Sequence, residues 1–204
     1  MTEERQVSAE RRDPRYAGWY ERRGRREEQR AWIREVRTKV AGGARGRVLE
    51  IGAGTGFNFR YYPRDAEVVA TDPDPEMRRL AEPRAREHGI DLRAAPAERL
   101  PCPDRSFDTV VSTGVFCAVD DAVAAIGEVH RVLRPGGVLR FSEHVRGRGA
   151  ARRMMQRALD PFHYRLFRCH IGRDTLGLLR DAGFEIVQLE HPRHADVVGV
   201  ARKR

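Results

Sequence analysis

Short apolar runs alternate with amphipathic stretches along most of the chain. Apolar runs without polar alternation are typical of strands that are buried on both faces of a parallel sheet. We expect strands at residues 47–51, 67–72, 91–95, 107–112, 137–143, 184–190 and 195–202. We expect helices at residues 25–41, 56–62, 75–88, 121–133, about 150–160 and 172–182. This alternation predicts an α/β domain whose mostly parallel sheet is covered by helices on both faces.

Three local features modify this picture. Only a few residues around Pro192 join the last two strands, too few for a crossover helix, so these strands must pair antiparallel. Pro83 should kink or split the helix in which it lies. Residues 1–24 are expected to be irregular or loosely helical, with the first dozen disordered. An aromatic cluster indicates that this charged tail docks on the domain: Tyr16, Trp19 and Tyr20.

The positive charge is concentrated in two flanking segments. The formal net charge of the 204 residues is +9, and residues 146–173 carry eight arginines against one acidic residue, Asp160. Residues 1–45 are also basic, whereas residues 46–145 are mildly acidic. Basic surfaces attract nucleic acid, anionic membranes or anionic substrates. Only two of the 39 basic residues are lysines, so the arginine bias runs through the whole chain, and nucleic acid is not expected as a partner.

The chain length indicates a single domain, and the cysteine content indicates a reducing compartment. The length suits one domain, and no run of about 18 apolar residues predicts a membrane-spanning helix. The charged N-terminus lacks the apolar centre of a signal peptide. The three cysteines, Cys102, Cys117 and Cys169, lie far apart and match neither a disulfide framework nor a zinc spacing. We therefore expect a cytoplasmic protein with buried or incidental cysteines and no metal site; the oligomeric state is not indicated.

The first predicted strand runs into a glycine-rich loop, Glu50-Ile51-Gly52-Ala53-Gly54-Thr55-Gly56. Glycines at alternate positions allow a sharp turn and the close approach of a ligand to the backbone. Dinucleotide-binding loops instead follow the pattern G-x-G-x-x-G and hold a pyrophosphate. The tighter spacing here and the carboxylate of Glu50 favour a nucleotide-type cofactor that carries positive charge.

Four ordered segments, 48–56, 68–72, 106–112 and 131–137, resemble the motifs of the class I S-adenosylmethionine-dependent methyltransferases. The resemblance spans about residues 16–190. It implies S-adenosyl-L-methionine as cofactor, with S-adenosyl-L-homocysteine as product. It also implies a Rossmann-like seven-stranded sheet of order 3-2-1-4-5-7-6 with strand 7 antiparallel.

The same resemblance implies that the chain has two segments with different roles. Residues 1–45 would form a tail and helix that cover the cofactor site. Residues 46–204 would form the methyltransferase domain, with a substrate-side segment at about 146–173.

Roles for individual residues follow from the resemblance. Asp72 would accept hydrogen bonds from both ribose hydroxyls, and Glu50 would face the methionine part of the cofactor. Tyr20 would close over the cofactor, where an aromatic face suits a sulfonium. The implied cofactor-binding residues are Tyr20, Glu50, Gly52, Ala53, Gly54, Thr55, Gly56, Asp72, Pro73, Met77, Ala97, Glu98, Thr113 and Gly114.

The substrate side is less defined. The segments 143–145, 159–161 and 166–169 resemble those of alkyl-thiol methyltransferases, and the chain as a whole is similar to ubiquinone/menaquinone C-methyltransferases. His144, Asp160 and His163 are candidates for a general base, with a structural role as the alternative for each. The basic, amphipathic residues 150–168 would form a lid over an apolar or anionic substrate, contact a membrane surface peripherally, or pack in the core.

We therefore expect a methyltransferase that acts on a small molecule, with thiol, hydroxyl, amine or carbon as the acceptor. One alternative is an RNA methyltransferase that uses the basic flanks. Another is a cofactor-binding module without turnover.

Overall fold

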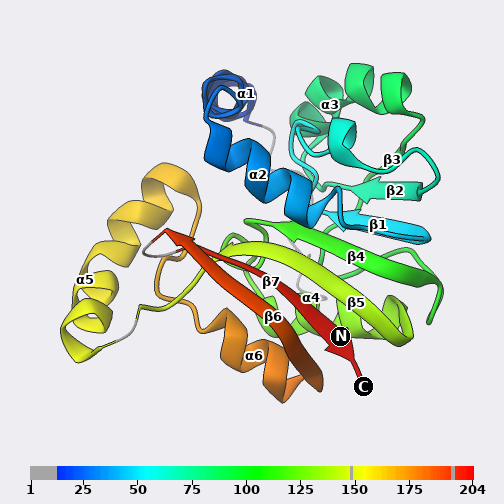
Figure 1. Ribbon diagram of the computed structural model, residues 1–204. Helices are drawn as coiled ribbons and strands as arrows, with labels where there is room; N and C mark the ends of the chain where they lie inside the picture. The colour runs from blue at the N-terminus through cyan, green and yellow to red at the C-terminus, as the bar shows by residue number, and fades with distance from the viewer. Residues whose placement is uncertain (1–12, 148, 194–195) are drawn as a thin grey trace, which may run out of the picture.

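The computed structural model describes residues 13–147, 149–193 and 196–204. Its centre is a seven-stranded sheet of order β3-β2-β1-β4-β5-β7-β6 (Figure 1). The strands are β1 Arg47–Ile51, β2 Glu67–Thr71, β3 Asp91–Arg93, β4 Phe107–Thr113, β5 Leu133–His144, β6 Phe184–Arg193 and β7 Asp196–Lys203. Only β7 runs antiparallel to its neighbours, β5 and β6. The predicted strand order and the antiparallel last strand are confirmed.

Helices cover both faces of the sheet. They are α1 Pro14–Glu27, α2 Ala31–Val40, α3 Pro75–His88, α4 Ala122–Val132, α5 Ala150–Phe167 and α6 Thr175–Asp181. Alternate residues of β1 face opposite layers: Val48 packs in the cluster that includes α2 and α3, whereas Leu49 packs in the one that includes α4 and α6. Both side chains are fully buried, so the strand reads as a continuous apolar run.

The N-terminal region is more ordered than the sequence predicts. A helix at 25–41 was expected after irregular or loosely helical chain, but residues 14–27 form the regular helix α1 and a separate helix begins at Ala31. The side chain of Asp13 accepts a hydrogen bond from the backbone N–H of Tyr16, and Pro14 follows it at the first helical position. These are standard start signals that the charge pattern obscured. The expected disorder of the first dozen residues lies outside the described part.

Three helix predictions need correction. The helix expected at 56–62 is only a 3-10 turn, Phe59–Tyr61, which Pro63 follows. Helix α3 runs unbroken past Pro83, so it is not split there and the expected kink stays a prediction. Helix α5 continues through Pro161 to Phe167 instead of ending near residue 160. Both prolines are exposed, so each ring lies on the solvent side of its helix.

Among the described residues, no helix has both the length and the apolar character needed to cross a bilayer. The cytoplasmic location and the division of the chain at residue 45 stay predictions.

Candidate active site

The glycine loop lies at the carboxyl end of β1. Gly52 and Gly54 adopt left-handed φ angles of +58° and +56°, which favour glycine. A Cβ atom on Gly52 would lie 2.6 Å from Cγ2 of Val115, so the loop leaves no room for a side chain there. The backbone N–H of Gly54 donates to Oδ2 of Asp72 at 2.8 Å, and that of Asp74 donates to Oδ1 at 2.9 Å. The acid at the end of β2 is therefore fixed against the loop.

Two carboxyl groups are buried at this loop. Glu50 is 2 % exposed; its Oε1 accepts from Nδ2 of Asn58 at 2.7 Å and its Oε2 accepts from the Tyr62 hydroxyl at 2.8 Å. Burial raises the pKa of Glu50 to about 7, against these two hydrogen bonds. Burial likewise raises the pKa of Asp72 to about 6. A cationic or hydroxyl-donating ligand would favour the ionised form of both groups.

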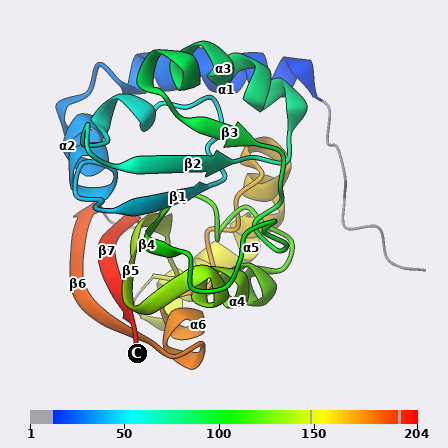
Figure 2. The same cartoon turned by 90° about the vertical axis from the view of Figure 1, so that its right-hand side faces the viewer.

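Helix α1 covers the loop beside α3 (Figure 2). A Cβ atom on Gly54 would lie 3.3 Å from Cε1 of Tyr20, so the tyrosine ring lies directly over the loop. Arg84 of α3 holds α1 against the loop, because it pairs with Glu21 of α1 at 2.7 Å and donates to the carbonyl of Thr55 at 2.8 Å. The expected position of Tyr20 over the cofactor loop agrees with this arrangement.

A cavity of about 20 Å³ remains between the loop and α1. Its lining residues are Tyr20, Arg37, Glu50, Gly52, Ala53, Thr55, Phe57, Asn58 and Thr113. Cofactor sites commonly measure several hundred Å³. The Tyr20 ring occupies space above the loop, so in this conformation the cavity is smaller than a nucleotide-sized molecule.

Arg37, Phe57 and Asn58 were missed from the sequence. Asn58 bridges the site, since its Nδ2 donates to Glu50 and, at 3.1 Å, to Oγ1 of Thr113. Its Oδ1 accepts from Arg37 of α2 at 2.6 Å. The position of Asn58 just after the glycine loop was a usable signal; nothing in the sequence brings Arg37 to it.

The remaining expected cofactor residues do not line this cavity. Gly56 has a φ of +80° and turns the chain, and Gly114 follows β4 with a φ of +68°. Met77 and Ala97 are buried, Glu98 is half-buried and Pro73 is exposed. Their expected contacts with adenosine stay predictions.

The substrate-side candidates come from two segments. His144 ends β5, with Nε2 3.1 Å from Oδ1 of Asp196. His163 lies on α5, and its ring centroid is 6.4 Å from that of His144. Asp160 pairs instead with Nδ1 of His170 at 2.7 Å. The structure thus brings His144 and His163 together, whereas Asp160 is paired with His170.

Helix α1 also reaches this side. The Tyr16 hydroxyl donates to the carbonyl of Phe167 at 3.2 Å, and the rings of Trp19 and Phe167 lie 5.9 Å apart. Arg168 pairs with Asp13 at 2.9 Å. One helix therefore joins the glycine loop to the end of α5, and the expected docking of the aromatic cluster is confirmed.

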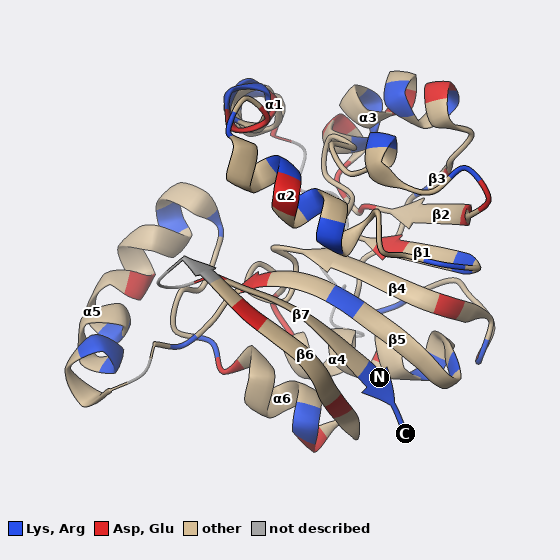
Figure 3. Ribbon diagram, in the orientation of Figure 1, with Lys and Arg blue, Asp and Glu red and all other residues tan. Residues whose placement is uncertain are grey.

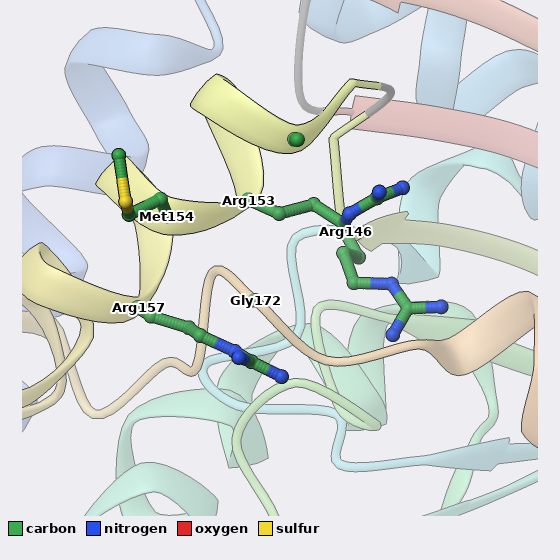
Figure 4. Close-up of a pocket in the computed structure, with 6 residues that line it drawn as sticks. Arg146, Arg153, Met154, Arg157 and Gly172 are labelled. Atoms are coloured by element: carbon green, nitrogen blue, oxygen red, sulfur yellow. The ribbon is translucent and has the colours of Figure 1, made fainter.

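Helix α5 stands out from the sheet and carries arginines with a single acidic residue (Figures 1 and 3). A larger cavity of about 350 Å³ lies beside its first turns, lined by Arg146, Ala150, Arg153, Met154, Arg157 and Gly172 (Figure 4). No acidic group among the described residues pairs with Arg153 or Arg157. This cavity can attract anions, but it is not formed by the glycine loop.

Comparison with known proteins identifies the family. A family model described as "Methyltransferase domain" matches residues 49–141. The rat thiol S-methyltransferase TMT1B is 37% identical over 150 residues, which are 70% of this chain and 62% of the relative. The human thiol S-methyltransferase TMT1B is 36% identical over 168 residues, 77% of this chain and 69% of the relative. The chain belongs to the class I SAM-dependent methyltransferases.

A solved SAM-dependent methyltransferase from Thermotoga maritima shares the fold with a TM-score of 0.68 and 26% identity, over 94% of this chain and 97% of that one. The cofactor of this methyltransferase family is S-adenosylmethionine, and the buried carboxylates of Glu50 and Asp72 suit its positive charge and ribose hydroxyls. The match to the rat enzyme spans somewhat less than two thirds of that protein's length.

Proposed function

We propose that this methyltransferase transfers the methyl group of S-adenosylmethionine to a small-molecule thiol. The supporting observation is the reach of the likeness to thiol S-methyltransferases. It covers 168 residues, whereas the family model covers only residues 49–141. The likeness therefore includes chain outside the cofactor motifs, where acceptor specificity is set.

The chain offers a group for each part of the cofactor. Asp72 would accept from the ribose hydroxyls, and Glu50 from the amino group of the methionine part. Arg37 places a guanidinium at the same cavity, where it would complement the methionine carboxylate. Tyr20 would present its ring to the sulfonium. When bound, the cofactor supplies an electrophilic methyl group.

The reaction asks the protein mainly for positioning. A thiol must approach in line with the carbon–sulfur bond that breaks, and it must lose its proton before or during attack. His144 and His163 lie on the side where the acceptor would bind, and either is the proposed proton acceptor. Asp160 would orient the imidazole of His170, to which it is hydrogen bonded, and would not itself take the proton.

A panel of acceptors tests the proposal. Formation of S-adenosylhomocysteine is measured with 2-mercaptoethanol, a phenol, a primary amine and a short RNA at low salt. We expect turnover with the thiol and its loss in Asp72→Ala. Turnover with RNA and not with the thiol would replace the proposal with the RNA alternative, and cofactor binding without any turnover would favour a binding module.

Helix α5 supports a proposal of peripheral contact with an anionic membrane surface. Met154, Phe162 and Leu166 are 72%, 71% and 65% exposed and recur at four-residue multiples on one helical face. Arg153 and Arg157 flank this face without acidic partners in the described chain. An apolar face bordered by arginines suits the boundary between headgroups and acyl chains of an anionic bilayer.

A further inference from the structure

Two cysteines and a histidine meet beside the acceptor side of the site. Cys117 follows β4, His144 ends β5, and Cys169 follows α5. Nδ1 of His144 lies 3.4 Å from Sγ of Cys169 and 3.8 Å from Sγ of Cys117. All three atoms lie within 4.8 Å of one another. The grouping arises only in the folded chain, since the residues are widely separated in sequence.

We propose that Cys117, His144 and Cys169 bind one thiophilic divalent cation of the zinc class. Zinc binds thiolates at about 2.3 Å and imidazole nitrogen at about 2.0 Å. At a tetrahedral angle these bond lengths place sulfur and nitrogen roughly 3.6 Å apart. The two observed separations, 3.4 and 3.8 Å, lie on either side of that value. The two sulfur–nitrogen separations therefore suit the ion already, and the two sulfurs lie within 4.8 Å of each other.

The surrounding contacts orient the ligands. Nε2 of His144 pairs with Asp196, which directs Nδ1 toward the sulfurs, as carboxylates do for metal-binding histidines. The buried Glu143 carboxylate accepts from the backbone N–H of Cys117 at 3.3 Å. The carbonyl of Cys169 lies 2.7 Å from Nδ1 of His163. Each ligand is thus held by a second group, which is typical of built metal sites.

Other uses of the cysteines fit less well. Both thiols are buried, and buried cysteines are ordinarily inert as nucleophiles. A disulfide between them would require an oxidant, whereas both cysteines are free thiols in the structure. Cys102 is buried but lies outside the cluster, so it provides a matched control.

Three ligands leave one position of a tetrahedral ion open, as in catalytic Cys2His zinc sites. No further Cys, His, Asp or Glu joins the cluster within the described ranges. Provided the proposed function holds, the open position would receive the acceptor thiol as a thiolate, with its proton passed to His163, because a metal-bound His144 cannot accept it. Its sulfur would then form the bond to the methyl carbon while the cofactor's carbon–sulfur electron pair returns to sulfur.

Cobalt(II) titration of the reduced full-length protein, without cofactor or acceptor, tests the site. We expect one equivalent to bind with thiolate-to-cobalt absorption, and zinc to displace it. Cys117→Ser, Cys169→Ser and His144→Gln should each weaken binding at least tenfold, whereas Cys102→Ser should not. The wild-type spectrum reports thiolate ligation even where a variant fails to fold.

Absence of thiolate absorption in the wild type would overturn the proposal, as would equal affinity in the cluster variants and Cys102→Ser. A Cys117–Cys169 disulfide combined with no cobalt affinity after reduction would also overturn it. Calorimetry with S-adenosylhomocysteine on Cys169→Ser separates this site from the proposed function, because cofactor binding should persist when the metal is lost.

Discussion

Replacing Glu50 with glutamine should stabilise the free protein and weaken cofactor binding at the same time. The carboxyl group is 2 % exposed and receives hydrogen bonds from Asn58 and Tyr62. A glutamine of the same size can accept from Asn58 through its oxygen, but its nitrogen cannot accept the proton that the Tyr62 hydroxyl donates to Glu50. The substitution therefore removes a buried charge without creating a cavity, and it loses one hydrogen bond of about 1 kcal/mol.

The size of the stability change follows from the pKa. Burial raises the pKa of Glu50 from 4.5 to about 7, so the folded state retains a proton that the unfolded state has lost. Wild-type stability should fall as pH rises from about 4.5 to 7, and the full cost above pH 7 is about 3 kcal/mol at 1.36 kcal/mol per pH unit. Glu50→Gln escapes this cost but loses the hydrogen bond from Tyr62, so its Tm at pH 8 should be roughly 4–8 °C above that of the wild type. At pH 5 the difference should shrink to under about 1 kcal/mol.

Cofactor affinity should move the other way. Loss of a charge-assisted hydrogen bond of about 1.5–3 kcal/mol weakens binding roughly 10- to 100-fold. Differential scanning fluorimetry at both pH values and calorimetry with S-adenosylhomocysteine at pH 8 measure the two effects. Glu67→Gln, at the exposed start of β2, is the control and should change neither quantity appreciably. Equal Tm values at pH 8, or an unchanged Kd, would refute the role given to Glu50.

Three further predictions concern helix α1 over the glycine loop, the carboxylate of Asp72 and helix α5. Arg84→Ala should weaken S-adenosylhomocysteine binding about tenfold by calorimetry, since it frees α1 from α3, whereas the exposed Arg86→Ala should not. Wild-type affinity should rise with pH through about 6, because hydroxyl donors favour the ionised Asp72, and Asp72→Asn should flatten this rise in the same titration. Phe162→Ser combined with Leu166→Ser should reduce cosedimentation with phosphatidylserine vesicles at least fivefold; equal binding to phosphatidylcholine vesicles would contradict the electrostatic part.

The sheet could be predicted because each strand carries its own signal. Val48, Leu49 and Ile51 are all fully buried, so β1 appears as a largely apolar segment in which Glu50 is the one charged residue after Arg47. The short connection predicted between the last two strands required their antiparallel pairing, although Pro192 itself lies within β6. The glycine loop and Asp72 were recognisable because local sequence alone sets them at the ends of neighbouring strands.

The remainder of the site depends on tertiary contacts that no local pattern encodes. Arg37 reaches Asn58 from another helix. Gly24 of α1 packs against the ring of Phe57, because a Cβ atom on it would lie 2.1 Å from that ring. The cysteine spacing excluded a zinc motif, yet folding brings Cys117 and Cys169 to the same histidine. Local signals predicted the cofactor loop; the acceptor side is assembled from distant segments.

The most direct test of the account is transfer of an isotopically labelled methyl group. The protein is incubated with S-adenosylmethionine carrying a deuterated methyl group and with 2-mercaptoethanol, and the products are analysed by mass spectrometry. The account predicts the deuterated methyl thioether together with one equivalent of S-adenosylhomocysteine, and neither product with Asp72→Ala. Bound cofactor without labelled thioether would contradict it.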